Sequence, residues 1–130
     1  MSCRCSRILI VDDEPDMGWV IENALASTDY VVKTVIRAAE ALDLLAVESY
    51  DIALVDAKLP DIDGIELAAI IRGESSNTVV ILISGYHRLE DSVIVEGLQN
   101  HLFADFIAKP FDIEEIREVI RQAKEGNCNR

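Results

Sequence analysis

Basic residues, aromatic side chains and long apolar runs are all scarce in this chain of 130 residues. Lys and Arg number 12 against 24 Asp and Glu, giving a formal charge of −12, which argues against a basic surface for nucleic acid phosphates or anionic lipid. No apolar run is long enough for a membrane span, and none follows Met1–Ser6 as it would in a signal peptide. The sequence therefore predicts a cytoplasmic protein without direct nucleic acid or membrane binding.

Cysteines are few and lie only at the chain ends. Cys3, Cys5 and Cys128 are an odd number, which predicts reduced thiols and no disulfide framework. The pair Cys3 and Cys5, with no further ligand at metal-site spacing, is weak evidence for a metal site. By contrast, 50% of the residues are hydrophobic although only 5% are aromatic. That composition is enough to bury one core in a single domain.

Short apolar runs alternate with segments of helical periodicity along the chain. The runs predict strands at 7–11, 30–35, 51–55, 79–83 and 104–108, and the stripes predict helices at 15–27, 38–46, 67–71, 89–99 and 113–123. Gly97 weakens the fourth helix, while Asp112 and Glu115 are typical of a capping pair for the fifth. Because parallel neighbours need crossover connections, the alternation predicts an α/β fold, a doubly wound five-stranded parallel sheet flanked by five helices.

Polar residues follow these strands at their carboxyl ends. They are Asp12, Asp13, Asp56, Ser84 and Lys109. Ligands of doubly wound sheets bind at this edge, so the five can share one crevice. Two carboxylates about 4 Å apart repel by roughly 4 kcal/mol at an effective dielectric near 20, which calls for a cation. Mg²⁺ suits carboxylate oxygens and phosphate. With a lysine and a hydroxyl nearby, the set has the parts for phosphoryl transfer, with a carboxylate as nucleophile.

Four motifs carry a family resemblance: ILIVDDEP, DIALVDAKLPDIDG, VVILISG and ADFIAKPF. Together they resemble the receiver domain of two-component response regulators over almost the whole chain. The resemblance implies a flavodoxin-like sheet of strand order 2-1-3-4-5. It places the receiver domain at 7–126, after a flexible N-terminal segment at 1–6 and before a C-terminal tail at 127–130.

The resemblance also implies a role for each site residue. Asp56 matches the phosphorylated aspartate, and a lysine before a proline, often joined by a cis bond, matches Lys109. Mg²⁺ would be held by Asp12, Asp13, Asp56 and the backbone carbonyl of Lys58. Phosphoryl transfer would use Asp56, Ser84 and Lys109. The conformational switch would use Ser84 and Phe106.

In this family the phosphoryl donor is a phosphohistidine on a histidine kinase or phosphotransfer protein. The domain catalyses its own phosphorylation and dephosphorylation and is not otherwise an enzyme. Phosphorylation would switch the surface of the fourth helix, fifth strand and fifth helix toward an output protein or domain, and a phosphorylation-dependent homodimer is compatible with this scheme.

Two features depart from the family pattern. Lys109 follows Ser84 by 25 positions, a few more than usual, and Phe103-Ala104 replaces the common Gly-Ala before the fifth strand. Phe106 lacks the hydroxyl of a tyrosine. Because this region, with the fourth helix, is the usual output face, these departures predict an unusual partner or dimer mode.

Alternative interpretations remain for the chain and for single residues. An Mg²⁺-dependent phosphatase with an aspartyl nucleophile would need an acid where Lys58 stands. A scaffold that is never phosphorylated would not need the complete site. A calcium loop at Asp61 is rejected, because the acids that it needs are replaced by Leu59 and Ile70.

Single residues also have structural interpretations. Asp13 could cap a helix, Asp56 and Asp61 could form turns, and Lys109 could form a structural ion pair. The pattern favours solvated side chains for the two histidines and packing roles for two aromatic residues. These residues are His87, His101, Trp19 and Phe111.

Overall fold

A computed structural model describes residues 6–26, 30–74 and 77–128 of the chain. The strands are β1 (Ser6–Val11), β2 (Tyr30–Val35), β3 (Ile52–Asp56), β4 (Val79–Ser84) and β5 (Asp105–Ala108). The helices are α1 (Pro15–Ala24), α2 (Ala38–Val47), α3 (Gly64–Glu74), α4 (Ser92–Gln99) and α5 (Ile113–Cys128). The strands pair in parallel in the order β2-β1-β3-β4-β5. The predicted doubly wound α/β fold is confirmed.

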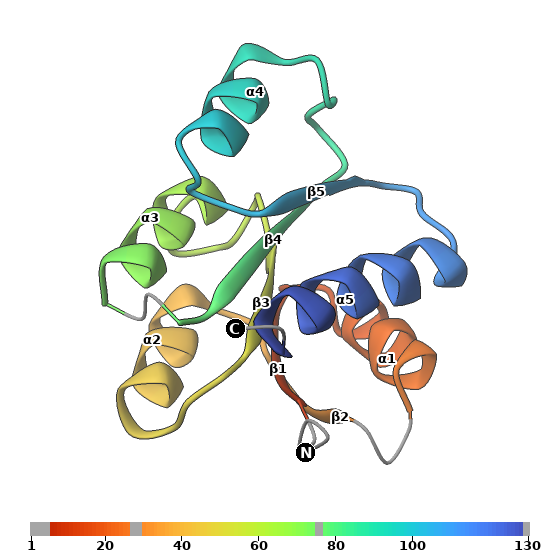
Figure 1. Ribbon diagram of the computed structural model, residues 1–130. Coiled ribbons are helices and arrows are strands. Elements are labelled where there is room, and N and C mark those ends of the chain that lie inside the picture. The colour runs from red at the N-terminus through yellow and green to blue at the C-terminus, as the bar shows by residue number, and fades with distance from the viewer. Residues whose placement is uncertain (1–5, 27–29, 75–76, 129–130) are drawn as a thin grey trace.

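Helices cover both faces of the sheet (Figure 1). Helices α1 and α5 pack on one face and α2 and α3 on the other, with α4 beside the β5 edge. Along β1, Ile8 and Ile10 point into one buried cluster and Leu9 and Val11 into the other. This burial on both faces explains why the central strands β1, β3 and β4 are largely continuous apolar runs.

The chain ends differ from the predicted boundaries. Ser6, assigned to a flexible segment, is buried and begins β1 by pairing with Tyr30. Helix α5 continues to Cys128, so the predicted tail at 127–130 starts inside the helix. Residues 1–5 and 129–130, with Cys3 and Cys5, lie outside the described residues, as does the side chain of Cys128. The thiol prediction therefore stays a prediction.

Helix α4 begins at Ser92, three residues later than predicted. The Asp91 carboxylate accepts the Arg88 backbone N–H at 2.9 Å, and the Asp91 N–H donates to the Arg88 carbonyl at 3.0 Å. These bonds hold 88–91 in a turn, and the extended backbone of Asp91, with φ of −63° and ψ of 139°, separates that turn from the helix. At α5 the predicted capping contact is present, since the Asp112 carboxylate accepts the Glu115 N–H at 2.8 Å.

The two aromatic predictions have opposite outcomes. Phe111 packs against the cluster between the sheet and α5. Trp19 is 66% exposed, so its predicted packing role is wrong, because α1 turns Gly18, Ile21 and Ala24 toward the interior and Trp19 away from it. No helix among the described residues combines the length and apolarity needed to cross a membrane.

Candidate phosphoryl-transfer site

Three carboxylates converge at the carboxyl edge of the sheet. Val11 of β1 is in register with Val55 of β3, so the residues that follow, Asp12 and Asp56, lie beside each other. Asp13 adds a third group, and one carboxylate oxygen from each residue lies within 4.8 Å of the others. Asp12 and Asp56 are buried whereas Asp13 is exposed. The sequence-predicted acids therefore share one site.

The ammonium group of Lys109 stands among these acids. Its Nζ atom lies 3.3 Å from Asp56 Oδ2, 3.4 Å from Asp12 Oδ2 and 3.1 Å from Glu14 Oε1. The Lys109–Pro110 peptide bond is cis, as the resemblance implied. Lys109 thus brings a positive charge from the end of β5 to acids at the ends of β1 and β3.

Burial and like charge perturb the ionisation of Asp12. Its pKa is raised from 3.8 to about 6, first by burial and then by the neighbouring Asp56 carboxylate, while the bond from the Glu14 N–H opposes the rise. Burial by itself lowers the pKa of Lys109, but the charges of Asp12 and Asp56 outweigh it and raise that pKa. One ammonium therefore compensates the acids only in part.

A cleft of about 440 Å³ opens above these groups. Its lining residues are Asp13, Glu14, Asp56, Lys58, Gly85, Tyr86 and Lys109. The Lys58 N–H donates to Asp56 Oδ1 at 3.2 Å, while the Lys58 ammonium lies 4.9 Å from the centre of the Tyr86 ring. A small charged group can therefore reach Asp56 from solvent.

The loop between β3 and α3 fixes the backbone of Asp56. Gly64 donates its N–H to the Ala57 carbonyl at 2.8 Å, and a Cβ at Gly64 would lie 2.0 Å from the Asp56 carbonyl oxygen. Only glycine allows this approach. The Asp61 carboxylate accepts the N–H groups of Ala38 and Ala39 at 3.1 and 2.9 Å, and these bonds lower its pKa. Asp61 therefore ties the loop to the start of α2.

The two residues assigned to the switch lie deeper. Ser84 ends β4 and is completely buried. Phe106 on β5 is also buried, in the cluster that faces α2, α3 and α4. Ser84 and Lys109 are joined through the backbone, because the Lys109 N–H donates to the Ser84 carbonyl at 2.8 Å.

Sequence reasoning missed two contacts at this site. Glu14 binds Lys109, which its position directly after Asp12 and Asp13 could have suggested. His87 was predicted to be solvated, but its ring is half-buried and its Nδ1 atom lies 2.8 Å from Ser84 Oγ. The three-residue spacing from Ser84 was the available signal. The solvated prediction holds for His101, which is exposed.

The donor set fits Mg²⁺. Three hard carboxylate oxygens within 4.8 Å of one another are the kind of ligands that this ion prefers, and Lys109 is the one ammonium that contacts Asp12 and Asp56 among the described residues. Asp12, Asp13 and Asp56 are therefore the residues that would hold the ion.

Known proteins resemble this chain in sequence. The family described as "Response regulator receiver domain" matches residues 8–121. The chain is 34% identical over 117 residues to response regulator protein PilR of Pseudomonas aeruginosa, covering 90% of this chain and 26% of that protein. It is 32% identical over 116 residues to sporulation initiation phosphotransferase F of Bacillus subtilis, covering 89% and 91%. The chain thus spans about a quarter of the length of PilR and of the regulatory protein AtoC of Escherichia coli.

Solved structures agree with the sequence relatives. A CheY-like receiver domain protein from Methanospirillum hungatei superposes with a TM-score of 0.85 at 30% identity, covering 95% of this chain and 96% of that one. Response regulator TrrA from Thermotoga maritima, solved in complex with Mg²⁺ and BeF, has a TM-score of 0.78 at 27% identity, covering 91% and 98%. This chain belongs to the response regulator receiver domain family, the phospho-accepting domains of two-component signal transduction.

Proposed function

We propose that Asp56 is the phosphorylated residue and that its donor is a phosphohistidine on a histidine kinase or phosphotransfer protein. One observation carries the proposal. The Asp56 carboxylate lies within 4.8 Å of two further carboxylates and 3.3 Å from the Lys109 ammonium. It also lines an open cleft. No other acid among the described residues has this combination of a metal-binding cluster, an ammonium partner and solvent access.

The chemistry assigns a task to each group. One Asp56 oxygen forms the new P–O bond while the P–N bond of the donor breaks and the electron pair returns to the imidazole. The Lys58 N–H binds Asp56 Oδ1 and leaves Oδ2 as the attacking oxygen beside Lys109. Mg²⁺ held by Asp12, Asp13, Asp56 and the Lys58 carbonyl would neutralise the carboxylates and the phosphoryl oxygens. Attack of water on phosphorus later returns Asp56 to its carboxylate, so the domain catalyses its own dephosphorylation.

Switching is part of the same proposal. The phosphoryl group would accept hydrogen bonds from Ser84 and Lys109, each worth roughly 1.5 to 3 kcal/mol as a charge-assisted bond. Their sum approaches the ~5.5 kcal/mol that moves a two-state equilibrium from about 1:99 to 99:1. Movement of Ser84 toward the phosphate would let Phe106 fill the space and alter the surface of α4, β5 and α5.

The partners follow from this scheme. We assign to the receiver domain the residues from the start of β1 at Ser6 to the end of α5 at Cys128. We further assign a cytoplasmic location, an upstream kinase or phosphotransfer protein, and a downstream output protein or domain. PilR and AtoC are about four times as long as the matched region, which supports an output module as the partner type.

Phosphorylation with a small donor tests the assignment. Incubation with Mg²⁺ and acetyl phosphate should add a single acid-stable, base-labile phosphate to the wild type, measured by intact-protein mass. Asp56→Asn should remain unmodified, whereas Asp43→Asn, which changes an exposed acid on α2, should be phosphorylated normally. An unmodified wild type would favour the scaffold interpretation, and rapid turnover of phosphate esters would favour the phosphatase.

A further inference from the structure

The Ser84 hydroxyl is fully engaged by the turn that follows it. Ser84 Oγ accepts the backbone N–H groups of Tyr86 and His87, each at 3.0 Å. The same oxygen lies 2.8 Å from His87 Nδ1. Ser84 is completely buried and His87 half-buried, so the three contacts lie largely away from solvent.

Counting protons fixes the direction of the third contact. A serine hydroxyl has two acceptor lone pairs and one proton. The two backbone N–H groups occupy both lone pairs, so the contact with His87 must use the Ser84 proton. In this contact His87 therefore accepts at Nδ1, which places the ring proton on Nε2.

This arrangement conflicts with the task that the proposed function gives Ser84. To bind a phosphoryl oxygen on Asp56, Ser84 must donate the proton that it now donates to His87. The backbone N–H groups suffice to form the turn, because they do not depend on the side chain of residue 87. The imidazole thus adds a hydrogen bond, from the Ser84 hydroxyl to His87 Nδ1, that exists only while the Ser84 proton points at the ring.

We propose that His87 is a positioning residue that holds the Ser84 hydroxyl in the unphosphorylated protein and competes with the phosphoryl group for its one proton. The proposal rests on the assignment of Asp56 and Ser84 above. A neutral hydrogen bond changes an equilibrium by roughly two- to tenfold. Loss of the imidazole acceptor should therefore favour the phosphoryl-bound state by about that factor.

Binding of beryllofluoride, which mimics a phosphoryl group, measures this competition at equilibrium. In Mg²⁺ at constant pH, His87→Ala should bind beryllofluoride roughly two- to tenfold more tightly than the wild type. His87→Asn should stay near the wild-type affinity, because its amide oxygen can replace Nδ1 as acceptor. The matched control is His101→Asn, at the other histidine of the sequence. His101 is exposed and has a positive φ of 61°, which asparagine tolerates.

A Ser84→Ala background separates positioning from a general effect on the loop. Ser84→Ala should itself bind more weakly, and adding His87→Ala to it should change the affinity no further. An equal tightening by His87→Ala with and without Ser84 would overturn the proposal. So would an unchanged affinity of His87→Ala in the wild-type background.

A nitrogen NMR spectrum of the neutral His87 ring tests the contact without any phosphoryl ligand. The expected result is an unprotonated Nδ1 and a protonated Nε2, and a protonated Nδ1 would overturn the proposal. This readout also separates the two hypotheses. If the wild type binds no beryllofluoride although Asp56 is intact, the proposed function fails, while the ring spectrum still decides whether Ser84 donates to His87.

Discussion

Asp12 serves the proposed site but, as a buried carboxylate, destabilises the folded chain. Its side chain is 2% exposed, and its pKa is raised to about 6 by burial and by the adjacent Asp56. A buried carboxylate with incomplete compensation destabilises the folded chain. The arrangement is understandable only if the acids serve a cation or a reaction.

Removal of this charge should therefore stabilise the protein when divalent ions are absent. The folded-state pKa of about 6 exceeds the ordinary 3.8, so the folded chain binds more protons between these values and its free energy of unfolding falls as pH rises through them. In chelator at neutral pH, Asp12→Asn should unfold with a free energy about 1 to 3 kcal/mol higher than the wild type. The gain should vanish below pH ~4.

Urea denaturation across this pH range measures the effect. Asp43→Asn removes an equal charge from an exposed position on α2 and should change stability by no more than about 0.5 kcal/mol. A gain for Asp12→Asn that is the same in acid and at neutral pH would contradict the raised pKa.

Sequence predicts some of these residues and not others for a physical reason. Asp12, Asp56 and Lys109 could be predicted to meet, because the carboxyl ends of parallel strands share one edge. The contact between His87 and Ser84 was missed, because the three-residue spacing only makes it possible, and whether it forms depends on the path of the loop after β4. Loop paths follow from turn bonds such as the Ser84 Oγ contacts, which leave little trace in hydrophobic periodicity.

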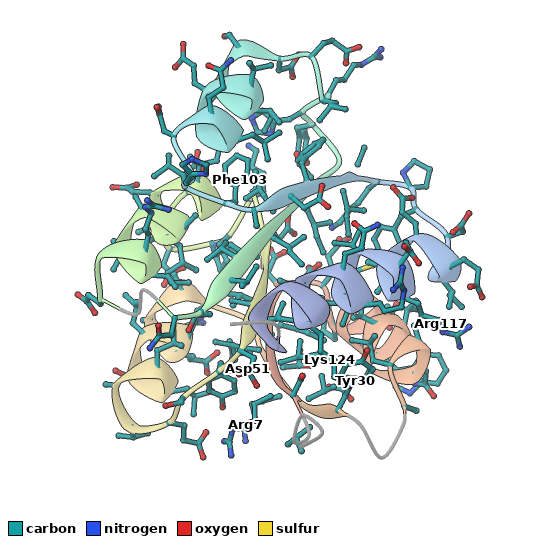
Figure 2. The ribbon with its side chains drawn as sticks, viewed as in Figure 1. Arg7, Tyr30, Asp51, Phe103, Arg117 and Lys124 are labelled. Atoms are coloured by element: carbon teal, nitrogen blue, oxygen red, sulfur yellow. The ribbon has the colours of Figure 1, made fainter. Side chains whose placement is uncertain are left out.

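At the scale of elements, α4 shows how the unusual segment before β5 is accommodated. The Leu102 N–H donates to the Gly97 carbonyl at 2.9 Å and the His101 N–H to the Leu98 carbonyl at 3.2 Å, the bond pair of a Schellman ending. His101 takes the left-handed position, with φ of 61°. Phe103 then turns inward beneath α4 (Figure 2) and is buried.

Gly97 is required by this packing, although sequence analysis identified it only as weakening the helix. A Cβ at Gly97 would lie 2.3 Å from the Phe103 ring. Gly97→Ala should therefore lower the free energy of unfolding by about 1 to 3 kcal/mol through overpacking. Gly73 on α3 is the matched control, because nothing lies within 4 Å of a Cβ there. Gly73→Ala should raise stability by up to about 1 kcal/mol.

Chemical denaturation of both variants and of a double variant checks the mechanism. If the aromatic ring is the obstacle, Gly97→Ala should be much less harmful in a Phe103→Leu background, so that the two changes are not additive. Equal stabilisation by Gly97→Ala and Gly73→Ala would show that Phe103 does not restrict this position.

At the scale of the molecule, topology was the most predictable property. Five apolar runs separated by helical stripes predict a parallel sheet with right-handed crossovers. The observed strand order β2-β1-β3-β4-β5 was implied by the family resemblance and not by the pattern. The net charge says less about where the functional site lies. The net charge of −12 attracts cations over the whole surface, so cation binding as such does not identify the site.

The magnesium dependence of thermal unfolding distinguishes the acidic site from this general attraction. At constant ionic strength the melting temperature of the wild type should rise with Mg²⁺ by several degrees, since a ligand at about 100 times its Kd contributes roughly 2.7 kcal/mol. Asp13→Asn removes one of the three clustered carboxylates and should lose most of that rise. Asp43→Asn carries the same overall charge but leaves the cluster intact, so it should keep the wild-type response. If both variants respond to Mg²⁺ equally, the ion stabilises the chain by screening its net charge and Asp13 is not a ligand.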